Sequence, residues 1–535
     1  MKRTTIGSVM RGICYGFAAL LFAASCANDD VAQDEKQKKD NIPAGTTVFT
    51  GTSQPDATTR TAILNHTKGT GASVNWSSTD KIWVKDDGGT WQQSAAATIP
   101  SAANQSFAKF SLSGTYTGTS HDIIYTNKAV SGSQPQVEIK TEQTQSAPNN
   151  FDHAGESGDC GIATGVKLGS GYNFTLTHKA SYLCLIPRTN NEYVKRSKLI
   201  KVEIMSDDEI AGTYNMAADG TLTLASGGSK TITVTTGSGF AIDNVADDIS
   251  KNATYAVVAP GTHTFRIRYW LRNTTDNPEG TIEGTISKIV TLNCTAGSIH
   301  DITANLNPYD YDGDHYYMWD AQQQYWYGYE WTKHLSGSTG QPILNYNSSS
   351  NYPQSNSDVS RWYNESYPGY GVSNPATHTS CKDLPNANEM SWYCMYGDPR
   401  WDADELWTTM GHLYKGGMWF KKKSVLLAEG NYNTEKSADN TTDLRTTYKF
   451  YVNSNSSITN SGLPSGADVN NYFYLPTLGV YTDGRLTIVG EVGYYWSSSA
   501  YPWLSGNAYD LGFSSGGVRV TDSPCSFGSR AEALQ

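Results

Sequence analysis

Between about residue 45 and residue 306, short runs of the chain alternate apolar and polar residues. Residues 82–84, 110–112 and 265–269 are examples, and Gly, Ser, Asp or Asn residues separate such runs. An alternation of period two puts every second side chain on one face of a strand, and the separating residues favour turns. We therefore predict β-sandwiches here. Because about 260 residues is long for one sandwich, we divide the region into residues 46–165 and 166–306.

After residue 315 this alternation gives way to aromatic clusters and long polar loops. Residues 316–331 are dense in Tyr and Trp, and residues 335–380 are rich in Ser, Asn, Tyr and Gly. Strands are predicted to resume towards the end of the chain, at residues 472–476, 486–489, 493–499, 508–513 and 517–520. The last part of the chain is thus predicted to differ in structure from the sandwiches.

Two helices are predicted before these last strands. Asn386 can cap the first helix, and Glu389, three residues later, completes a capping box. The second helix is predicted over residues 403–413, where Leu406, Met410 and Leu413 would face inward. The acids that begin this second segment are interpreted as a cluster at a helix N-terminus, where negative charge is stabilising. They are Asp402, Asp404 and Glu405.

The first 26 residues have the pattern of an export signal. A short apolar run, residues 18–24, follows Lys2, Arg3 and Arg11. The run is too short to cross a bilayer as a stable helix, so residues 1–25 are predicted to be a secretory signal peptide. The next residue, Cys26, follows Ala-Ser as in a bacterial lipobox, although Ala23 stands where leucine is usual. This resemblance implies that Cys26 is acylated; the alternative is an ordinary secreted protein.

Residues 26–45 are polar and charged, without an apolar period, and are predicted to form a tether. Asp29 and Asp30, close behind Cys26, resemble the signal that sends Bacteroidales lipoproteins to the outer face of the outer membrane. The alternative is a merely solvated acidic linker. Acyl chains contribute about 0.8 kcal/mol per buried CH₂, so two or three chains would hold the protein at the outer membrane. The predicted location is therefore the cell surface.

Charge and motifs exclude several functions. The net charge is −11 and no basic stripe is present, which disfavours nucleic-acid binding. No GxSxG, HExxH or phosphate-loop motif occurs, so no catalytic residue and no cofactor are predicted. Residues 307–315 are acidic and turn-rich, but their glycine comes too early for a calcium loop and the closing glutamate is missing. We interpret them as a linker and predict no metal site.

Six cysteines follow Cys26, and they allow 15 disulfide connectivities between which the spacing does not decide. None forms a CxxC motif. Several are interpreted as buried thiols, because the predicted cores do not need disulfides. They are Cys160, Cys184, Cys294, Cys381, Cys394 and Cys525.

Residues 45–306 resemble the fimbrillin family of Bacteroidales pili. The resemblance lies in the order of short motifs at residues 59–61, 74–76, 80–84, 174–180, 257–261 and 297–302. It implies two transthyretin-like β-sandwich domains, lipoprotein export, and proteolysis after a basic residue that frees a groove for strand exchange with other pilus subunits. Arg60 is the candidate for that cut. The alternative is an ordinary exposed arginine in a polar turn.

Residues 316–530 resemble the "major paralogous" domain, which has a C-type-lectin-like fold. The matching segments are residues 381–389, 474–476, 493–499 and 508–513. The resemblance implies an α+β domain over residues 316–535. The family usually ends on a strand whose cysteine can pair with the position of Cys381, but here Cys525 lies upstream, which leaves that pairing open. Formylglycine-generating enzymes share the fold and need a cysteine pair near the chain end; only Cys525 lies there, so enzymatic activity is not expected.

A ligand-binding surface is predicted near the C-terminus. If Trp496, Leu511 and Phe513 face the core, Asp510 and Arg519 point outward. Stiff aromatic rings beside small polar groups are typical of adaptable binding surfaces, and such rings also stack on sugars. The alternative is that these aromatics cover the domain's own core. The predicted ligand-binding residues are Tyr501, Trp503, Asn507, Asp510, Arg519 and Asp522.

Together these features predict a surface lipoprotein that acts as a fimbrillin-type pilus tip or accessory adhesin and binds a glycan or a protein. A bulky terminal domain is expected to obstruct strand donation, which favours a tip position. One alternative is a non-polymerising carbohydrate-binding lipoprotein that captures polysaccharide. A weaker alternative is an enzyme on a scaffold similar to formylglycine-generating enzymes.

Overall fold

The computed structural model describes residues 45–52, 62–64, 66–69, 73–101, 105–132, 134–332, 349–366, 375–454, 458 and 462–535. Strands hold 46% of the residues and helices 8%, which confirms the predicted mainly β fold. All described residues belong to one compact unit that begins at Pro43. Within these ranges no helix has the length and apolar character needed to cross a bilayer. Cys26 and Arg60 lie outside the described residues.

The first sheet has the order β5-β4-β7-β10-β11-β1-β6, with β12 paired to β10. Its strand β1 runs parallel to β11 on one side and antiparallel to β6 on the other. Phe49 of β1 is fully buried and stacks on Tyr172 of β11, with ring centroids 4.6 Å apart. The strands are β1 (Thr47–Thr52), β4 (Trp83–Lys85), β5 (Trp91–Gln93), β6 (Phe107–Leu112), β7 (Ser120–Tyr125), β10 (Gly161–Leu168), β11 (Gly171–Thr175) and β12 (Thr177–His178).

A small sheet joins β2 (Ala62–Leu64) to β3 (Ser73–Asn75). The predicted boundary between residues 165 and 166 falls inside β10, which pairs with β7 from Gly161 to Val166. The domain bounds themselves stay a prediction.

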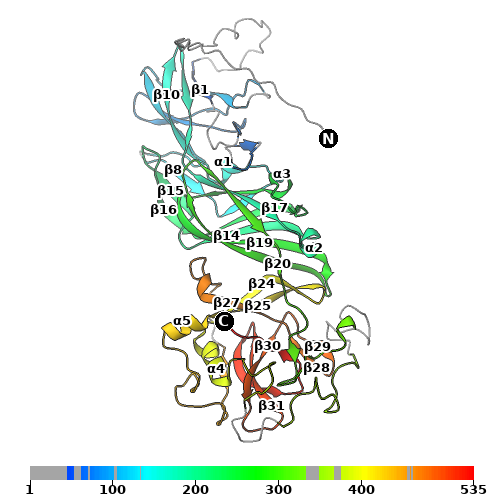
Figure 1. Ribbon diagram of the computed structural model, residues 1–535. Coiled ribbons are helices and arrows are strands. Elements are labelled where there is room, and N and C mark those ends of the chain that lie inside the picture. The colour runs from blue at the N-terminus through cyan, green and yellow to red at the C-terminus, as the bar shows by residue number, and fades with distance from the viewer. Residues whose placement is uncertain are drawn as a thin grey trace, which may run out of the picture. The chain divides into compact units, whose positions relative to one another are not determined.

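The largest core lies among three further sheets: β18-β13-β21, β16-β15-β8 and β27-β25-β24-β20-β19-β14-β17-β9. Figure 1 shows β14, β19 and β20 side by side in the middle of the long sheet. The strands are β8 (Gln136–Ile139), β9 (Glu142–Thr144), β13 (Ser181–Arg188), β14 (Lys198–Ser206), β15 (Ala211–Met216), β16 (Leu222–Ser229), β17 (Thr231–Ala241), β18 (Thr254–Val258), β19 (Gly261–Asn277), β20 (Gly280–Cys294) and β21 (Ile299–Asn305). Three single-turn helices border them: α1 (Ala154–Ser157), α2 (Glu192–Lys195) and α3 (Ile249–Asn252).

The predicted helix over residues 403–413 is wrong, because these residues form two strands of the long sheet. β24 (Arg400–Thr409) pairs with β20 through Thr285 and Glu405, and also with β25 (His412–Lys421). Met410 and Gly411, between the two strands, both have positive φ, as the tightest hairpin turns require. Leu406 and Leu413 do point inward, but into the core of the long sheet. The spacing that resembled a helix therefore belongs to a hairpin.

The acids of β24 are correspondingly not at a helix end. Glu405 accepts hydrogen bonds from the backbone N–H and the hydroxyl of Ser287 at 3.1 and 2.7 Å. Asp402 is 1% exposed and lies against Arg266 and Arg268 of β19. β22 (Tyr309–Asp310), within the predicted linker, also pairs with β24. Residues 309–311 thus run beside a strand of the long sheet.

The last part of the chain contains a six-stranded sheet, β23-β33-β30-β31-β32-β26, and a two-stranded sheet, β28-β29. The predicted helix at Asn386 is confirmed as α4 (Ala387–Tyr396), and its capping box with Glu389 is present. The other elements are β23 (Tyr316–Tyr317), η1 (Glu330–Thr332), α5 (Lys423–Ala428), β26 (Tyr451–Asn453), η3 (Val469–Asn471), β27 (Tyr472–Pro476), β28 (Val480–Thr482), β29 (Arg485–Thr487), β30 (Gly493–Ala500), β31 (Asn507–Ser514), β32 (Gly517–Pro524) and β33 (Ser529–Arg530). In the described ranges all six cysteines are buried free thiols.

Candidate ligand-binding surface

Three aromatic side chains beside the six-stranded sheet are about half exposed. Tyr448, Phe450 and Trp503 are 46%, 45% and 48% exposed, and we call these three residues the aromatic surface. Tyr448 contacts Trp503 with ring centroids 3.8 Å apart, so the segment before β26 meets the loop between β30 and β31. Apolar rings kept in water on two adjoining segments are more typical of a binding surface than of a scattered exposed residue.

Tyr501 supports the aromatic surface from below. It is only 7% exposed, stacks on Phe450 at 6.0 Å and meets Tyr509 edge-on at 5.3 Å. Burial, together with the nearby carboxylate of Asp522, raises the pKa of Tyr501. The structure therefore makes Tyr501 a packing residue that positions Phe450, not an exposed contact.

A polar pair borders the aromatic rings. Asn507 Nδ2 donates to Asp522 Oδ2 at 2.5 Å, and both residues are half-buried. Because an asparagine amide has two protons and a carbonyl oxygen, Asn507 keeps further hydrogen-bonding capacity for a ligand. Tyr501 N–H donates to the Asn507 carbonyl at 3.0 Å, so this polar pair lies beside Tyr501. That these residues bind a ligand stays a prediction.

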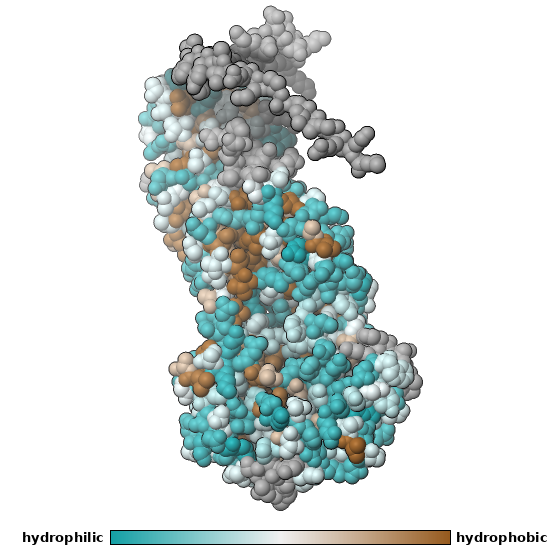
Figure 2. All heavy atoms as spheres, in the orientation of Figure 1, coloured by the Kyte–Doolittle hydropathy of each residue, from teal (hydrophilic) through white to brown (hydrophobic). Residues whose placement is uncertain are grey.

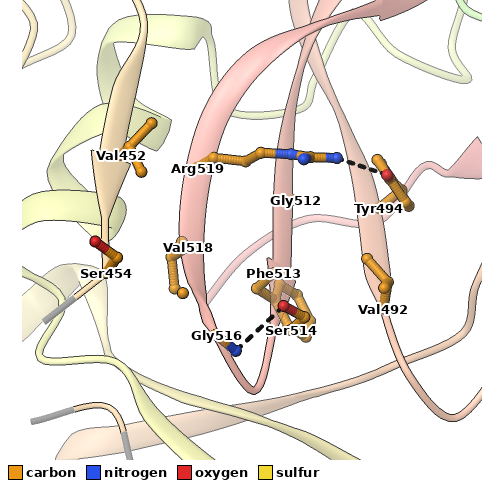
Figure 3. A pocket seen from close by; sticks show the side chains of 11 residues that line it. Val452, Ser454, Val492, Tyr494, Gly512, Phe513, Ser514, Gly516, Val518 and Arg519 are labelled. Carbon is orange, nitrogen blue, oxygen red and sulfur yellow. Dashed lines mark hydrogen bonds between the residues drawn. The ribbon is translucent and has the colours of Figure 1, made fainter. Parts of the chain in front are cut away.

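A groove of about 240 Å³ lies over the same sheet. Its floor is a row of paired residues from four strands: Val452, Arg519, Gly512 and Tyr494. Figure 3 shows Arg519 extended across Gly512 towards Tyr494, to whose hydroxyl oxygen its Nη2 donates at 2.6 Å. A Cβ atom at position 512 would lie 3.0 Å from Arg519 Nε, so glycine there lets the arginine lie flat. Arg519 is exposed, as predicted.

The prediction that the Asp510 carboxylate points outward is wrong, because this residue is completely buried. It alternates with Tyr509 and Leu511, which face one core, but its own face is also covered, by a cluster that includes Trp496. At Asp510, unlike at Gly512 two residues on, the strand is covered on both faces, so this position offers no solvent side to a polar residue. Asp510 is therefore not placed to touch a ligand directly.

Few interactions replace the water that the Asp510 carboxyl loses on burial. Neither oxygen has a hydrogen-bond partner among the described residues, although the Ser523 hydroxyl lies near enough to lower the pKa slightly. Burial dominates and raises the pKa of Asp510 to about 7. A Cβ atom at Gly512 would lie 3.7 Å from Asp510 Oδ1, which puts this carboxyl close beneath the crossing of Arg519.

Tyr448 and Phe450 were not among the predicted ligand-binding residues. The pattern that would have found them is an alternation in which Tyr448, Phe450 and Val452 share one face of an edge segment, and all three are exposed. Over the region that carries α4, α5, β30 and β31, the visible face is mostly hydrophilic with small hydrophobic patches (Figure 2). Three adjoining exposed aromatics form a larger apolar area than a scattered exposed residue does.

No protein-family model matches the chain, and no curated protein does either. A solved structure described as a proposed cell adhesion protein from Bacteroides ovatus is 13% identical, covers 49% of this chain and 91% of its own, and has a TM-score of 0.30. One described in the same way from Bacteroides fragilis is 10% identical, with coverages of 48% and 92% and a TM-score of 0.28. The fimbrial anchor protein Mfa2 from Porphyromonas gingivalis is 9% identical, with coverages of 47% and 99% and a TM-score of 0.20. These likenesses cover just under half of the chain. Its membership of the fimbrillin family stays a prediction from the sequence.

Proposed function

We propose that this protein is a cell-surface adhesin of the fimbrillin type that binds a glycan with its C-terminal, lectin-like region. The aromatic surface carries the proposal: Tyr448, Phe450 and Trp503 are half exposed on two adjoining segments, beside the polar pair Asn507 and Asp522. A sugar ring presents C–H groups that stack on aromatic faces and hydroxyls that need a small number of fixed polar partners. A lipid anchor on Cys26 would hold the uncleaved adhesin at the outer membrane.

The binding test uses the full mature chain on a glycan array, followed by titration of the best ligand. Trp503→Ala and Phe450→Ala are expected to weaken binding at least tenfold, because each removes one stacking face. Trp331→Ala is the matched control, since Trp331 is 69% exposed but contributes no part of the aromatic surface. Equal binding by Trp503→Ala and Trp331→Ala would contradict the proposed site. Binding of a protein in place of any glycan would keep the surface but change the ligand class.

A second proposal, that β1 is exchanged during pilus assembly, is favoured by the position of this strand. β1 lies between β11 and β6, so its removal would leave two strand edges and the pocket of Phe49 open to a donor strand. Arg60, the candidate for cleavage, lies between β1 and β2 in the sequence. N-terminal sequencing of the protein extracted from cells tests this proposal. A mature N-terminus at Thr61 that is lost in Arg60→Ala is expected, and an N-terminus at Cys26 in both would contradict it.

Residues 529–535 are held by neighbouring elements, which favours a tip or capping position over donation of this segment. The backbone carbonyl of Gln535 accepts hydrogen bonds from Lys423 N–H at 2.8 Å and from the Tyr393 hydroxyl at 3.1 Å, and β33 pairs with β23. A segment held in this way is not free to be donated to another subunit. Antibody against residues 316–535 is therefore expected to label pilus ends, and labelling along the whole length would contradict this position.

A further inference from the structure

A histidine, a cysteine and an aspartate from distant parts of the chain meet on the three-stranded sheet. Cys184, in the middle strand β13, pairs with Tyr255 of β18 on one side and with Asp301 of β21 on the other. These three residues therefore form one row across the sheet, and Cys184 is completely buried. Pairing in register fixes the distance between the thiol and the carboxylate without any loop.

The third ligand comes from residues 66–69. His66 is 5% exposed, and its Nε2 lies 2.8 Å from Asp301 Oδ1. The backbone N–H of Gly69 donates to the other carboxylate oxygen at 2.7 Å. One ligand atom from each of His66, Cys184 and Asp301 lies within 4.8 Å of the others. The Nδ1 atom of His66 is buried without a hydrogen-bond partner among the described residues, so the contacts of this ring are incomplete.

We propose that His66, Cys184 and Asp301 bind a zinc ion. Imidazole nitrogen, thiolate sulfur and carboxylate oxygen together suit Zn²⁺, since Ca²⁺ and Mg²⁺ take oxygen ligands almost exclusively. With tetrahedral metal–ligand distances of about 2.0–2.3 Å the ligand atoms lie roughly 3.3–3.7 Å apart, so His66 Nε2 and Asp301 Oδ1, now 2.8 Å apart, would separate slightly around the ion. Three protein ligands leave the fourth tetrahedral position to water.

Binding would rearrange the protons in a defined way. The Cys184 thiol loses its proton to solvent. The Nε2 proton that His66 donates to Asp301 also leaves while Nδ1 takes one up, so the imidazole stays neutral and Nε2 presents its lone pair to the metal. The hydrogen bond between His66 and Asp301 is then replaced by two bonds to zinc. The Gly69 N–H still holds the second oxygen of Asp301 and orients this ligand.

A second buried His–Asp pair lacks the third ligand that Cys184 provides. His178 Nδ1 lies 2.8 Å from Asp159 Oδ1, the same separation as between His66 and Asp301. Among the described residues, however, only His66, Cys184 and Asp301 bring three ligand atoms of this kind within reach of one another. The difference is the thiol of Cys184.

Zinc binding would hold residues 66–69 against β21. Besides the hydrogen bonds of His66 and Gly69 to Asp301, Lys68 Nζ lies 2.5 Å from Asp247 Oδ2 in an exposed ion pair. Exposed ion pairs contribute little, whereas a metal bond between His66 and β21 would hold the segment on the sheet. The Asp301 side chain is 14% exposed, which gives the ion a route of entry.

The test measures metal in the full chain after chelation and reloading with Zn²⁺ or Co²⁺. One metal per chain is expected, with a thiolate-to-cobalt charge-transfer band in the near ultraviolet and a Zn²⁺-dependent rise in melting temperature. All three signatures should be lost in His66→Gln and kept in His178→Gln. Because Cys184→Ser alters the middle strand of the sheet and risks misfolding, His66→Gln carries the test, with the equally buried His178→Gln as its matched control. Absence of metal from the unmutated chain, or equal metal binding by His66→Gln and His178→Gln, would overturn the proposal.

Discussion

Arg268 of β19 reaches Asp402 of β24 across the long sheet, with Nη2 3.4 Å from Oδ1. The same guanidinium lies 3.2 Å from Asp404 Oδ2 and 3.0 Å from Glu203 Oε2. Arg268 and Asp402 are nearly buried, at 7% and 1% exposure. One cation thus serves three carboxylates, two of them on the strand that joins the last part of the chain to the sheet of β19 and β20.

Arg268→Met is expected to destabilise the protein by about 3–5 kcal/mol, because it leaves the buried Asp402 without this counter-charge. Urea denaturation measures the loss. Arg272→Met is the matched control on the same strand, since its partner Glu283 is exposed and such pairs contribute less than about 1 kcal/mol. Equal losses in the two variants would mean that the ion cluster does not hold β24 in place.

Asp510 predicts a pH dependence of stability. Its pKa of about 7 in the folded protein is above the ordinary value of 3.8, so the folded state holds this proton more tightly than the unfolded state. The stability that Asp510 allows is therefore highest below about pH 4 and falls as the pH rises towards 7, by roughly 4 kcal/mol at most. Asp510→Asn removes the titration and is expected to be more stable than the unmutated chain at pH 8 but not at pH 4. Denaturation curves that differ equally at both pH values would contradict this.

Elements whose bounds depend on neighbouring residues were predicted correctly. The capping box of Asn386 and Glu389 lies within four residues, and α4 begins where the box requires. The helix prediction for residues 403–413 failed because these residues pair as strands, with β25 in a hairpin and with β20, which lies about 120 residues away in the sequence. Helical spacing of Leu406, Met410 and Leu413 cannot reveal that pairing, and pairing with β20 and β25 overrides it.

The site was predicted in part for the same reason. Trp503 and Arg519 are exposed as expected, but the outward position of Asp510 assumed that β31 has a solvent face. The proposed zinc ligands could not be predicted from sequence spacing, since 235 residues separate His66 from Asp301. Cys184 carries no local signature at all; only its register with Asp301 makes it a candidate.

Arg519 predicts a preference for acidic sugars within the proposed glycan-binding function. Its planar guanidinium can bind a carboxylate with two parallel hydrogen bonds, which lysine cannot do. Arg519→Lys is therefore expected to weaken binding of carboxylated glycans about tenfold and to leave neutral glycans unchanged. Calorimetric titration of one glycan of each kind checks this, with Lys449→Arg as a charge-preserving control on the segment before β26. An equal loss for neutral and acidic glycans would place Arg519 in a purely structural role.

The close packing of Gly51 is expected to contribute to the stability of β1 in its sheet. A Cβ atom at this position would lie 2.9 Å from Phe174 Cζ and 3.1 Å from Trp76 Cζ2, and both rings are packed in the core. Gly51→Val is therefore expected to cost about 1–3 kcal/mol by overpacking. Because β1 also joins β6 to β11, its loosening should spread to both neighbours.

Hydrogen exchange followed by mass spectrometry measures this effect strand by strand. Amides of β1, β6 and β11 should lose protection in Gly51→Val, while α4, which belongs to a different core, keeps its protection. Thr50→Val is the matched control, because Thr50 is on the opposite face of β1 and is half-buried. If Gly51→Val exchanged no faster than Thr50→Val, β1 would be held by its strand pairing alone, and close packing of Gly51 would not govern its release.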